Sequence, residues 1–341
     1  MRAVVLAGGA GARLEPAEVD DPVPGPGQVV ARVRYCGICG SDLHIAASAG
    51  RAGMVMGHEI AGVLEEVGEG VDDRWVPGTP VTARPFLGCG TCTWCARGRP
   101  DHCAAFHLVG YTRPGGFAER VLLSGDELFQ LPASLAGPEQ ALVEPLAVAL
   151  HGLRRAGVRR GEPVAVLGAG PIGLAVTTWA RTLGAGPVLV SDPVAGRRDL
   201  ASGFGADAVV DPTTEDVAAA CRQTLCTEPS LVVECSGKPG MIQQAMHLAA
   251  VDGRVGVVGA CMAPDTLVPF TGLHKELEVR FALYYDRRDF VDTLQALDDG
   301  SLAVEGLITD VVGLDALPDT FATMLAGSDR GKVVVTPRAP A

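Results

Sequence analysis

The 341-residue chain lacks an excess of positive charge, a long apolar run and any internal repeat. Its 28 lysine and arginine residues stand against 40 acidic residues, for a formal net charge of −12. That balance argues against nucleic acid or an acidic membrane surface as a partner. No apolar run reaches the roughly 18 residues of a membrane span, and residues 1–14 lack the apolar core of a secretory signal. We therefore expect a cytoplasmic protein that does not bind membranes.

Hydrophobic residues make up 48% of the chain and charged residues 20%. This composition is typical of globular proteins, and the length suits two domains. Up to about Leu123, short β-rich runs separated by glycine and proline predict a mostly β domain. Strands are expected at 29–35, 60–67, 80–83 and 118–123.

A regular alternation of strands and helices follows a helix expected at Glu139–Ala156. The expected strands are 163–167, 188–191, 208–210, 231–234 and 254–258, and the helices are 172–183, 196–204, 214–225 and 240–250. This cadence predicts a parallel, doubly wound sheet. The tail has a helix expected at 289–299 and strands at 311–312 and 332–336, and we expect it to return to the first domain. The predicted domains are therefore 1–150, 151–285 and 286–341.

Four cysteines are clustered with the spacing C-x2-C-x2-C-x7-C, namely Cys89, Cys92, Cys95 and Cys103. Four thiolates at this spacing can converge on one ion, as a closed structural zinc site requires. The alternatives are two disulfides or four buried thiols, and a reducing compartment disfavours disulfides. Five other cysteines lie in apolar contexts and are expected to be inert, namely Cys36, Cys221, Cys226, Cys235 and Cys261.

A G-x-G-x-x-G motif stands where a predicted strand meets a predicted helix, and it contains Gly168, Gly170, Pro171, Ile172 and Gly173. The first glycine allows a tight turn, the second lets a pyrophosphate approach the backbone, and the third lets the helix pack on the strand. The helix N-terminus offers N–H groups to the phosphates. We interpret the motif as a dinucleotide site.

Asp192 follows the next predicted strand, where an acid binds the adenosine ribose hydroxyls and repels a 2′-phosphate. This favours NAD over NADP. Arg197 and Arg198 follow closely. They could grip a 2′-phosphate, or pair with Asp192 and line the adenosine edge.

A second glycine-rich stretch, residues 6–14, resembles the phosphate loop of sugar nucleotidyltransferases. That loop needs a helix directly after it, whereas Glu15-Pro16 and a proline- and glycine-rich segment follow here. We therefore predict a turn between two strands.

Three further motifs are YCGICGSDLH at residues 35–44, MGHE at 56–59 and VEPLAVALH at 143–151. Together with the cysteine cluster and the glycine motif, they resemble zinc-dependent medium-chain alcohol dehydrogenases over essentially the whole chain. The sorbitol, threonine and butanediol dehydrogenase branch is the most similar. The resemblance implies a GroES-like β catalytic domain, a Rossmann coenzyme domain and an active site in the cleft between them.

The resemblance also implies roles for individual residues. Cys39 and His58 would bind a catalytic zinc, with Glu59 or Glu144, or both in exchange, as the third ligand. Ser41 would accept the substrate proton and pass it through the nicotinamide ribose to His44 and solvent. It further implies two zinc ions per chain, a small alcohol or ketone substrate, and a homodimer or homotetramer, with the edge strand near 278–283 available for pairing.

Two segments depart from the family pattern. Residues 45–56 are unusually small and apolar, and Ala282–Tyr285 stands where relatives place a Gly-Ser pair near the nicotinamide amide. The predicted reaction is reversible alcohol–ketone oxidoreduction by hydride transfer. The alternatives are reduction of a C=N or C=C bond on the same scaffold and a non-catalytic NAD-binding structural role. The presence of Ser41, His44 and all the zinc-ligand positions argues against both.

Overall fold

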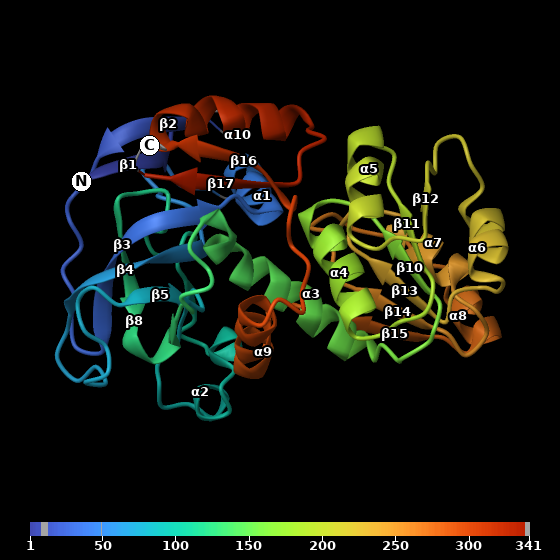
Figure 1. The fold of residues 1–341 in the computed structure, drawn as a ribbon, viewed down its shortest axis with the longest axis horizontal. Coiled ribbons are helices and arrows are strands. Elements are labelled where there is room, and N and C mark those ends of the chain that lie inside the picture. Colours follow the sequence, from blue (N-terminus) through green and yellow to red (C-terminus); the bar gives the residue numbers. More distant parts are fainter. Residues whose placement is uncertain (8–12, 49, 338–341) are drawn as a thin grey trace. The chain divides into compact units, whose positions relative to one another are not determined.

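The computed structural model describes residues 1–7, 13–48 and 50–337, and the chain divides into two compact units (Figure 1). Unit 1 comprises Met1–Glu144, Ile308–Ser328 and Lys332–Ala341, and unit 2 comprises Pro145–Leu307 and Asp329–Gly331. This division differs from the predicted borders, because residues 145–150 and 286–307 belong to unit 2. Two contacts explain why residues 286–307 belong to unit 2. Phe290 stacks on Tyr285 with ring centroids 5.5 Å apart, and the Thr178 hydroxyl donates to the Ala303 carbonyl.

A seven-stranded sheet forms the centre of unit 1, in the order β16-β17-β3-β4-β5-β9 with β8 paired to β3. The strands of unit 1 are β1 (Arg2–Leu6), β2 (Leu14–Glu18), β3 (Gln28–Gly37), β4 (Glu59–Val67), β5 (Pro80–Ala83), β6 (Phe86–Leu87), β7 (His107–Leu108), β8 (Arg120–Ser124), β9 (Leu128–Gln130), β16 (Ile308–Gly313) and β17 (Lys332–Thr336). Strands β4 and β17 run antiparallel to β3, so that Cys36 lies opposite both Ile60 and Val335. The predicted β domain is confirmed.

Unit 1 also contains short helices that connect its strands. They are α1 (Gly40–Ser48), α2 (Thr93–Ala96), η1 (Pro100–His102), η2 (Gly125–Glu127), η3 (Pro138–Leu142), η4 (Leu314–Ala316) and α10 (Leu317–Ala326), and α3 (Val143–Ala156) starts there. Helices α1 and α10 were not predicted. Leu317 and Phe321, four residues apart, bury one face of α10, whereas α1 buries only Asp42 and Ala46. A helix that buries so little apolar surface leaves almost no periodic signal in its sequence.

The second glycine-rich stretch connects the two strands of a hairpin. Strand β1 pairs antiparallel with β2, from Arg2 opposite Glu18 to Leu6 opposite Leu14. A strand, not a helix, therefore follows the stretch. Residues 8–12, where the sequence predicts the turn, lie outside the described residues.

Unit 2 is built on a six-stranded parallel sheet in the order β12-β11-β10-β13-β14-β15. Its elements are β10 (Val164–Leu167), α4 (Pro171–Thr182), β11 (Val188–Ser191), α5 (Ala195–Gly203), β12 (Ala208–Val210), α6 (Val217–Leu225), β13 (Leu231–Glu234), α7 (Met241–Leu248), β14 (Arg254–Val257), α8 (Pro269–Lys275), β15 (Glu278–Phe281) and α9 (Arg287–Asp298). The chain moves outward one way from β10 and the other way from β13. Right-handed crossovers therefore place helices on both faces, with α4 and α5 opposite α6 and α7 in Figure 1. The predicted doubly wound fold is confirmed.

The central strands of unit 2 are buried along their whole length, as expected for parallel strands covered on both faces. Both β10 and β13 consist of fully buried residues. Within the described residues, no helix combines the length and apolar character needed to cross a membrane.

The contact between α4 and the start of its own motif predicts the effect of adding one methyl group. A Cβ on Gly173 would lie 1.8 Å from the Gly168 carbonyl oxygen. We expect Gly173→Ala to lower the free energy of unfolding by about 2–3 kcal/mol, although alanine is the better helix former. In the control Gly203→Ala, in helix α5, the new methyl group meets no described atom within 4 Å, so the same change should be neutral or stabilising by up to about 1 kcal/mol. Urea unfolding of both variants measures the contrast, and equal effects would contradict the packing argument.

Candidate metal and dinucleotide sites

One edge of the unit 1 sheet brings together the two motifs around Cys39 and His58. Strand β3 ends at Gly37, directly opposite Glu59, the first residue of β4. Cys39 lies just beyond β3, and helix α1 begins at the next residue. Strand β17 begins at Lys332 on the other side of β3. Strand pairing therefore places a thiol, an imidazole, a carboxylate and an ammonium group at one edge.

The ligand atoms of Cys39, His58 and Glu59 lie within 4.8 Å of one another. His58 and Glu59 are buried and Cys39 is half-buried. A thiolate, an imidazole and a carboxylate are donors that catalytic zinc sites use, with a fourth position left open. Glu59 Oε2 is buried and has no hydrogen-bond partner within the described residues. These residues therefore fit a zinc ion, which would use that oxygen.

Two glycines make room for this arrangement. A Cβ on Gly37 would lie 1.8 Å from Glu59 Oε2, so only glycine fits opposite the carboxylate. Gly57 has φ +91°, a conformation that disfavours other residues, and a Cβ there would lie 2.6 Å from the Phe117 ring. The glycines beside Cys39 and His58 are thus explained by close packing.

Lys332 holds the other oxygen of Glu59. Its ammonium group donates to Glu59 Oε1 at 2.6 Å and to the Ile38 carbonyl at 3.1 Å, and both charged side chains are almost fully buried. Burial lowers the pKa of Lys332, but the charges of Glu59, Cys39 and Glu144 outweigh burial and raise the pKa. The sequence analysis missed this residue. The available signal was a lysine that begins an otherwise apolar terminal strand.

Asp42 connects Cys39 with His58. Its Oδ2 accepts the Cys39 backbone N–H at 2.9 Å, and its Oδ1 lies 3.4 Å from His58 Nδ1. Burial lowers the pKa of His58, but the fully buried Asp42 carboxylate outweighs burial, and the pKa lies well above its usual value. A carboxylate on one ring nitrogen orients the imidazole and leaves the other nitrogen for a ligand.

The remaining predicted residues of this site lie on two helices. Ser41 and His44 are three residues apart on α1 and so occupy neighbouring positions on its surface. Ser41 is half-buried and His44 is exposed. Glu144 is buried in the first turn of α3, close enough to Lys332 to influence its pKa. It does not belong to the group whose ligand atoms lie within 4.8 Å.

The structure brings Cys89, Cys92, Cys95 and Cys103 together, with their sulfurs within 4.8 Å of one another. The sulfurs of Cys92 and Cys95 are 3.6 Å apart, close to the roughly 3.8 Å that tetrahedral zinc–sulfur bonds of about 2.3 Å require. Hydrogen bonds from the Thr91 backbone and hydroxyl lower the pKa of Cys89 to about 6, whereas burial raises that of Cys95 to about 11. All ten cysteines are free. The cluster therefore fits a zinc ion and contains no disulfide.

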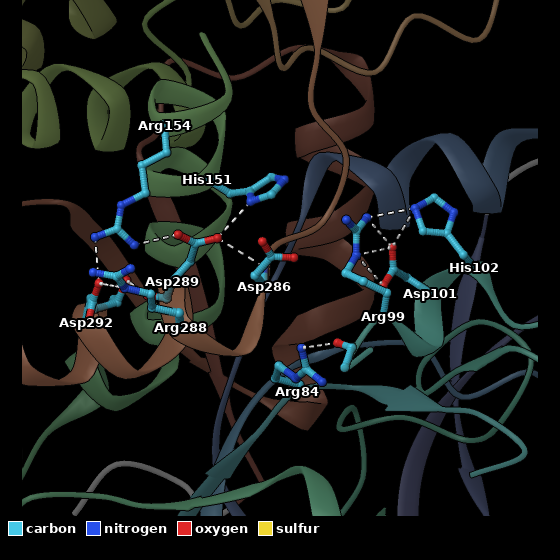
Figure 2. A network of polar contacts seen from close by, with 12 residues as sticks. Arg84, Arg99, Asp101, His102, His151, Arg154, Asp286, Arg288, Asp289 and Asp292 are labelled. Carbon is cyan, nitrogen blue, oxygen red and sulfur yellow. Dashed lines mark hydrogen bonds and ion pairs between the residues drawn. The ribbon is translucent and has the colours of Figure 1, made fainter. Parts of the chain in front are cut away.

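Arg84, directly after β5, connects the sheet to the segment that contains the four cysteines, residues 89–103; its side chain is labelled in Figure 2. Its buried guanidinium donates to Glu127 at 2.6 and 3.0 Å and to the Gly98 carbonyl at 3.4 Å. Within that segment, Arg99 binds both Asp101 and His102. Of these contacts, the Arg84–Glu127 pair is buried, whereas the side chains of Arg99 and His102 are partly exposed.

In unit 2, the turn from β10 to α4 has the shape of a phosphate cradle. Gly168 has φ +101°, and Gly173 packs against it. Gly170 is the N-cap of α4, has no side-chain cap, and is followed by Pro171 at the first helical position. A Cβ on Gly170 would meet no described atom within 4 Å. The turn therefore leaves open space in front of a helix N-terminus, which fits a dinucleotide pyrophosphate.

Asp192 is buried directly after β11 and is tied to the glycine motif. Its Oδ2 accepts the Ala169 N–H and its Oδ1 the Val194 N–H, both at 2.8 Å. Arg197 Nη1 lies 3.9 Å from the carboxylate. Arg198 donates to the Asp192 carbonyl and pairs with Asp211 at 3.1 Å. The carboxylate thus lies beside the pyrophosphate cradle, with one of the two arginines directed to another acid.

A third group of possible ligands, His151, Asp286 and Asp289, lies within unit 2 (Figure 2). Asp289 is bound by His151 Nδ1 at 2.7 Å and by Arg154 Nη1 at 2.6 Å. Asp286 and Asp289 also form the capping box that starts α9. Because an arginine already balances the Asp289 charge, we interpret the group as a structural link between α3 and α9, not as a metal site.

Comparisons with known proteins give one consistent family. Residues 25–133 match the alcohol dehydrogenase GroES-like domain, and residues 171–299 match the zinc-binding dehydrogenase domain. The chain is 35% identical to 2-dehydro-3-deoxy-L-galactonate 5-dehydrogenase of Pseudoalteromonas atlantica, over 88% of this chain and 89% of the relative. It is 34% identical to L-threonine 3-dehydrogenase of Pyrococcus horikoshii, over 96% and 95%. An NADP-bound structure described as a zinc-binding dehydrogenase, from Sinorhizobium meliloti, superposes with a TM-score of 0.89 at 32% identity, covering 98% and 99%.

The link between α3 and α9 predicts a pH-dependent stability. Burial raises the pKa of Asp289, but the hydrogen bonds from His151 and Arg154 outweigh burial and lower it. The stability that Asp289 contributes is therefore present above its unfolded pKa of about 3.9 and is lost as the pH falls through the lower folded value. We expect Asp289→Asn to cost about 2–3 kcal/mol at neutral pH, with the difference from wild type shrinking below about pH 4.

The control is Asp292→Asn, because Asp292 also pairs with Arg154 but is more exposed. It should cost less than about 1 kcal/mol. Urea unfolding between neutral and acid pH measures both variants. A cost for Asp289→Asn that persists unchanged at acid pH would contradict the assigned pKa.

Proposed function

The chain belongs to the zinc-dependent medium-chain dehydrogenases and is an alcohol or polyol oxidoreductase, and from this premise we propose that it interconverts a secondary alcohol and its ketone. The observation that carries the proposal is the group formed by Cys39, His58 and Glu59, with Glu59 Oε2 free of hydrogen bonds in the described residues. The names of the two curated relatives give positions 5 and 3 as the oxidised carbons. Both carbons carry secondary hydroxyl groups in those substrates.

In this proposal, Cys39, His58 and Glu59 hold the catalytic zinc, and the four clustered cysteines hold a structural zinc. A bound zinc ion supplies a Lewis acid that lowers the pKa of the substrate hydroxyl. Lys332 keeps Glu59 directed by one oxygen and compensates part of the negative charge of the ligands. Glu144, buried nearby, is the alternative carboxylate for the same position.

Ser41 and His44 move the substrate proton. The Ser41 hydroxyl follows Cys39 closely in the chain and is partly accessible, so it can hold the proton that leaves the alcohol. His44 lies on the same helix and is exposed, so its imidazole can release the proton to solvent. Retention of both residues favours alcohol chemistry over reduction of a C=N or C=C bond.

The cofactor is proposed to be NAD, bound by residues 168–173 and Asp192. A nicotinamide cofactor supplies the acceptor for the hydride. The buried Asp192 charge beside the cradle disfavours a 2′-phosphate, and Arg198 is directed to Asp211. Arg197 then lines the adenosine edge. The NADP-bound relative from Sinorhizobium meliloti makes a direct comparison of the two cofactors necessary.

Replacing Cys39 tests the catalytic zinc. Cys39→Ser should lower the zinc content from two ions to one per chain and reduce oxidation of secondary alcohols and polyols at least about a hundredfold. NADH binding should change less than about twofold, because the dinucleotide site is built in unit 2. Metal content by mass spectrometry, NADH fluorescence and a panel of alcohols measure these outcomes.

The matched control is Cys226→Ser, an exposed cysteine far from the motif in sequence, which should leave two zinc ions and full turnover. Turnover that survives Cys39→Ser would refute the proposed metal ligand. Turnover of imines or enones with inertness toward every alcohol would favour the reductase alternative.

Replacing Asp192 tests the cofactor preference. Wild type should have a higher kcat/KM with NAD than with NADP. Asp192→Asn, which removes the charge but keeps an acceptor oxygen, should reduce that ratio about tenfold. Asp199→Asn, an exposed change on α5, should leave the ratio unaltered. A wild-type preference for NADP would overturn the NAD proposal.

We further propose a homo-oligomer in a reducing compartment such as the cytoplasm. All ten cysteines are free, which suits such a compartment. Edge strand β15 exposes Phe281, and Glu278 pairs with Arg280 along it. Two antiparallel copies of such a strand could place opposite charges across from each other. Sedimentation at micromolar concentration should give a dimer or tetramer, and a monomer would remove this proposal.

A further inference from the structure

The two halves of a doubly wound sheet divide a dinucleotide between them, and the division lies where the strand order reverses. In unit 2 that point is between β10 and β13. Asp192, after β11, belongs to the adenosine side. The nicotinamide side therefore lies over the ends of β13 and β14. This step rests on the proposed dinucleotide site.

Glu234 is the last residue of β13 and is almost fully buried at this point. Its Oε1 accepts the Ser236 N–H at 2.7 Å, the Ser236 hydroxyl at 2.6 Å and the Gly237 N–H at 2.9 Å. The turn that follows β13 thus folds back on the carboxylate of the residue that ends the strand. One charged oxygen fixes three donors, and hydrogen bonds to a charged acceptor are the stronger kind.

The same turn is packed between two glycines. A Cβ on Gly168, in the pyrophosphate cradle, would lie 3.0 Å from the Ser236 nitrogen. A Cβ on Gly259, after β14, would lie 2.5 Å from Glu234 Oε2 and 2.3 Å from the Gly237 nitrogen. The Cys235 N–H donates to Leu167 on β10 at 2.8 Å. The turn 235–237 therefore contacts the cradle directly, and its packing against Gly168 and Gly259 restricts its position.

We propose that Glu234 is a positioning residue for the nicotinamide half of the cofactor. It holds the turn 235–237 in the shape that the cofactor meets, so that ordering this segment adds little cost on binding. Burying a carboxylate is expensive unless hydrogen bonds replace those it made with water, and here three donors at one oxygen replace them. The charge is explained by the need to hold three donors at one oxygen beside the cradle.

The test compares a whole cofactor with its adenosine half. Glu234→Ala should raise the dissociation constant of NADH, and the KM for NAD, about tenfold. It should leave the dissociation constant of AMP nearly unchanged, whereas the donors of Ser236 and Gly237 that lose their acceptor should lower the thermal midpoint of the free protein. Glu234→Gln, which keeps an acceptor oxygen, should recover most of the NADH affinity. NADH fluorescence and calorimetry with AMP measure these values.

The matched control is Asp207→Asn. Asp207 Oδ2 accepts the Val188 N–H at 2.7 Å. The variant therefore weakens a hydrogen bond between a carboxylate and the backbone, as Glu234→Ala does, but at the amino ends of the strands. It should leave both affinities unchanged. If Glu234→Ala fails to fold, Ser236→Ala removes one of the three donors and should shift NADH binding in the same direction by a smaller factor.

Equal losses of NADH and AMP affinity, or no loss of either, would overturn the role of Glu234. The same holds if Asp207→Asn weakens NADH as much as Glu234→Ala does. Failure of the proposed function is a separate result, because wild type would then bind neither NADH nor NADPH.

Discussion

The register between β3 and β4 is the constraint on which the proposed metal site depends. It places Gly37 directly opposite Glu59, at the edge where Cys39 and His58 also lie. A shift by one residue would turn the Glu59 side chain to the other face of the sheet and would put a side chain where Gly37 leaves space. Strand β3 also pairs with β17, and this pairing brings Lys332 to the Glu59 carboxylate. Ligand geometry here is therefore a result of strand pairing, which the buried core of unit 1 holds in place.

Charge balance is the second requirement at this edge. The carboxylates of Asp42 and Glu59 lie close to Cys39 and His58 in a buried site, and leaving their charges uncompensated would be costly. Lys332 supplies one positive charge and a divalent ion would supply two more. The lysine binds one oxygen of Glu59 and leaves the other, so it stabilises the apo site without blocking the metal position. A neutral residue in its place would leave Glu59 to be neutralised by the metal alone.

Residues close in sequence were the easiest part to predict. The cysteine spacing, the glycine motif and strands such as 80–83 and 188–191 follow from local patterns, because each depends on a few neighbouring residues. The Lys332–Glu59 pair could not be predicted, because 273 positions separate its partners. Nor could the place of 286–307 in unit 2, which depends on packing of Phe290 and on the Thr178 hydroxyl. The sequence predicts Glu234 only as the end of a strand, because two of its three partners are backbone groups that no sequence pattern identifies.

In each unit, a glycine on a neighbouring strand end makes room for a buried carboxylate. In unit 1, Gly37 lies against Glu59 Oε2, and in unit 2, Gly259 lies against Glu234 Oε2. In both, a buried carboxylate has one oxygen held by strong donors, and the absence of a side chain on the neighbouring strand end makes room for the other. A carboxylate held at one oxygen has one orientation, whereas a free one has many. In the roles proposed for the two carboxylates, as a metal ligand and as support for the wall of a cofactor site, each needs a fixed direction before the metal or cofactor binds. The glycines are therefore as much a part of the two sites as the acids are.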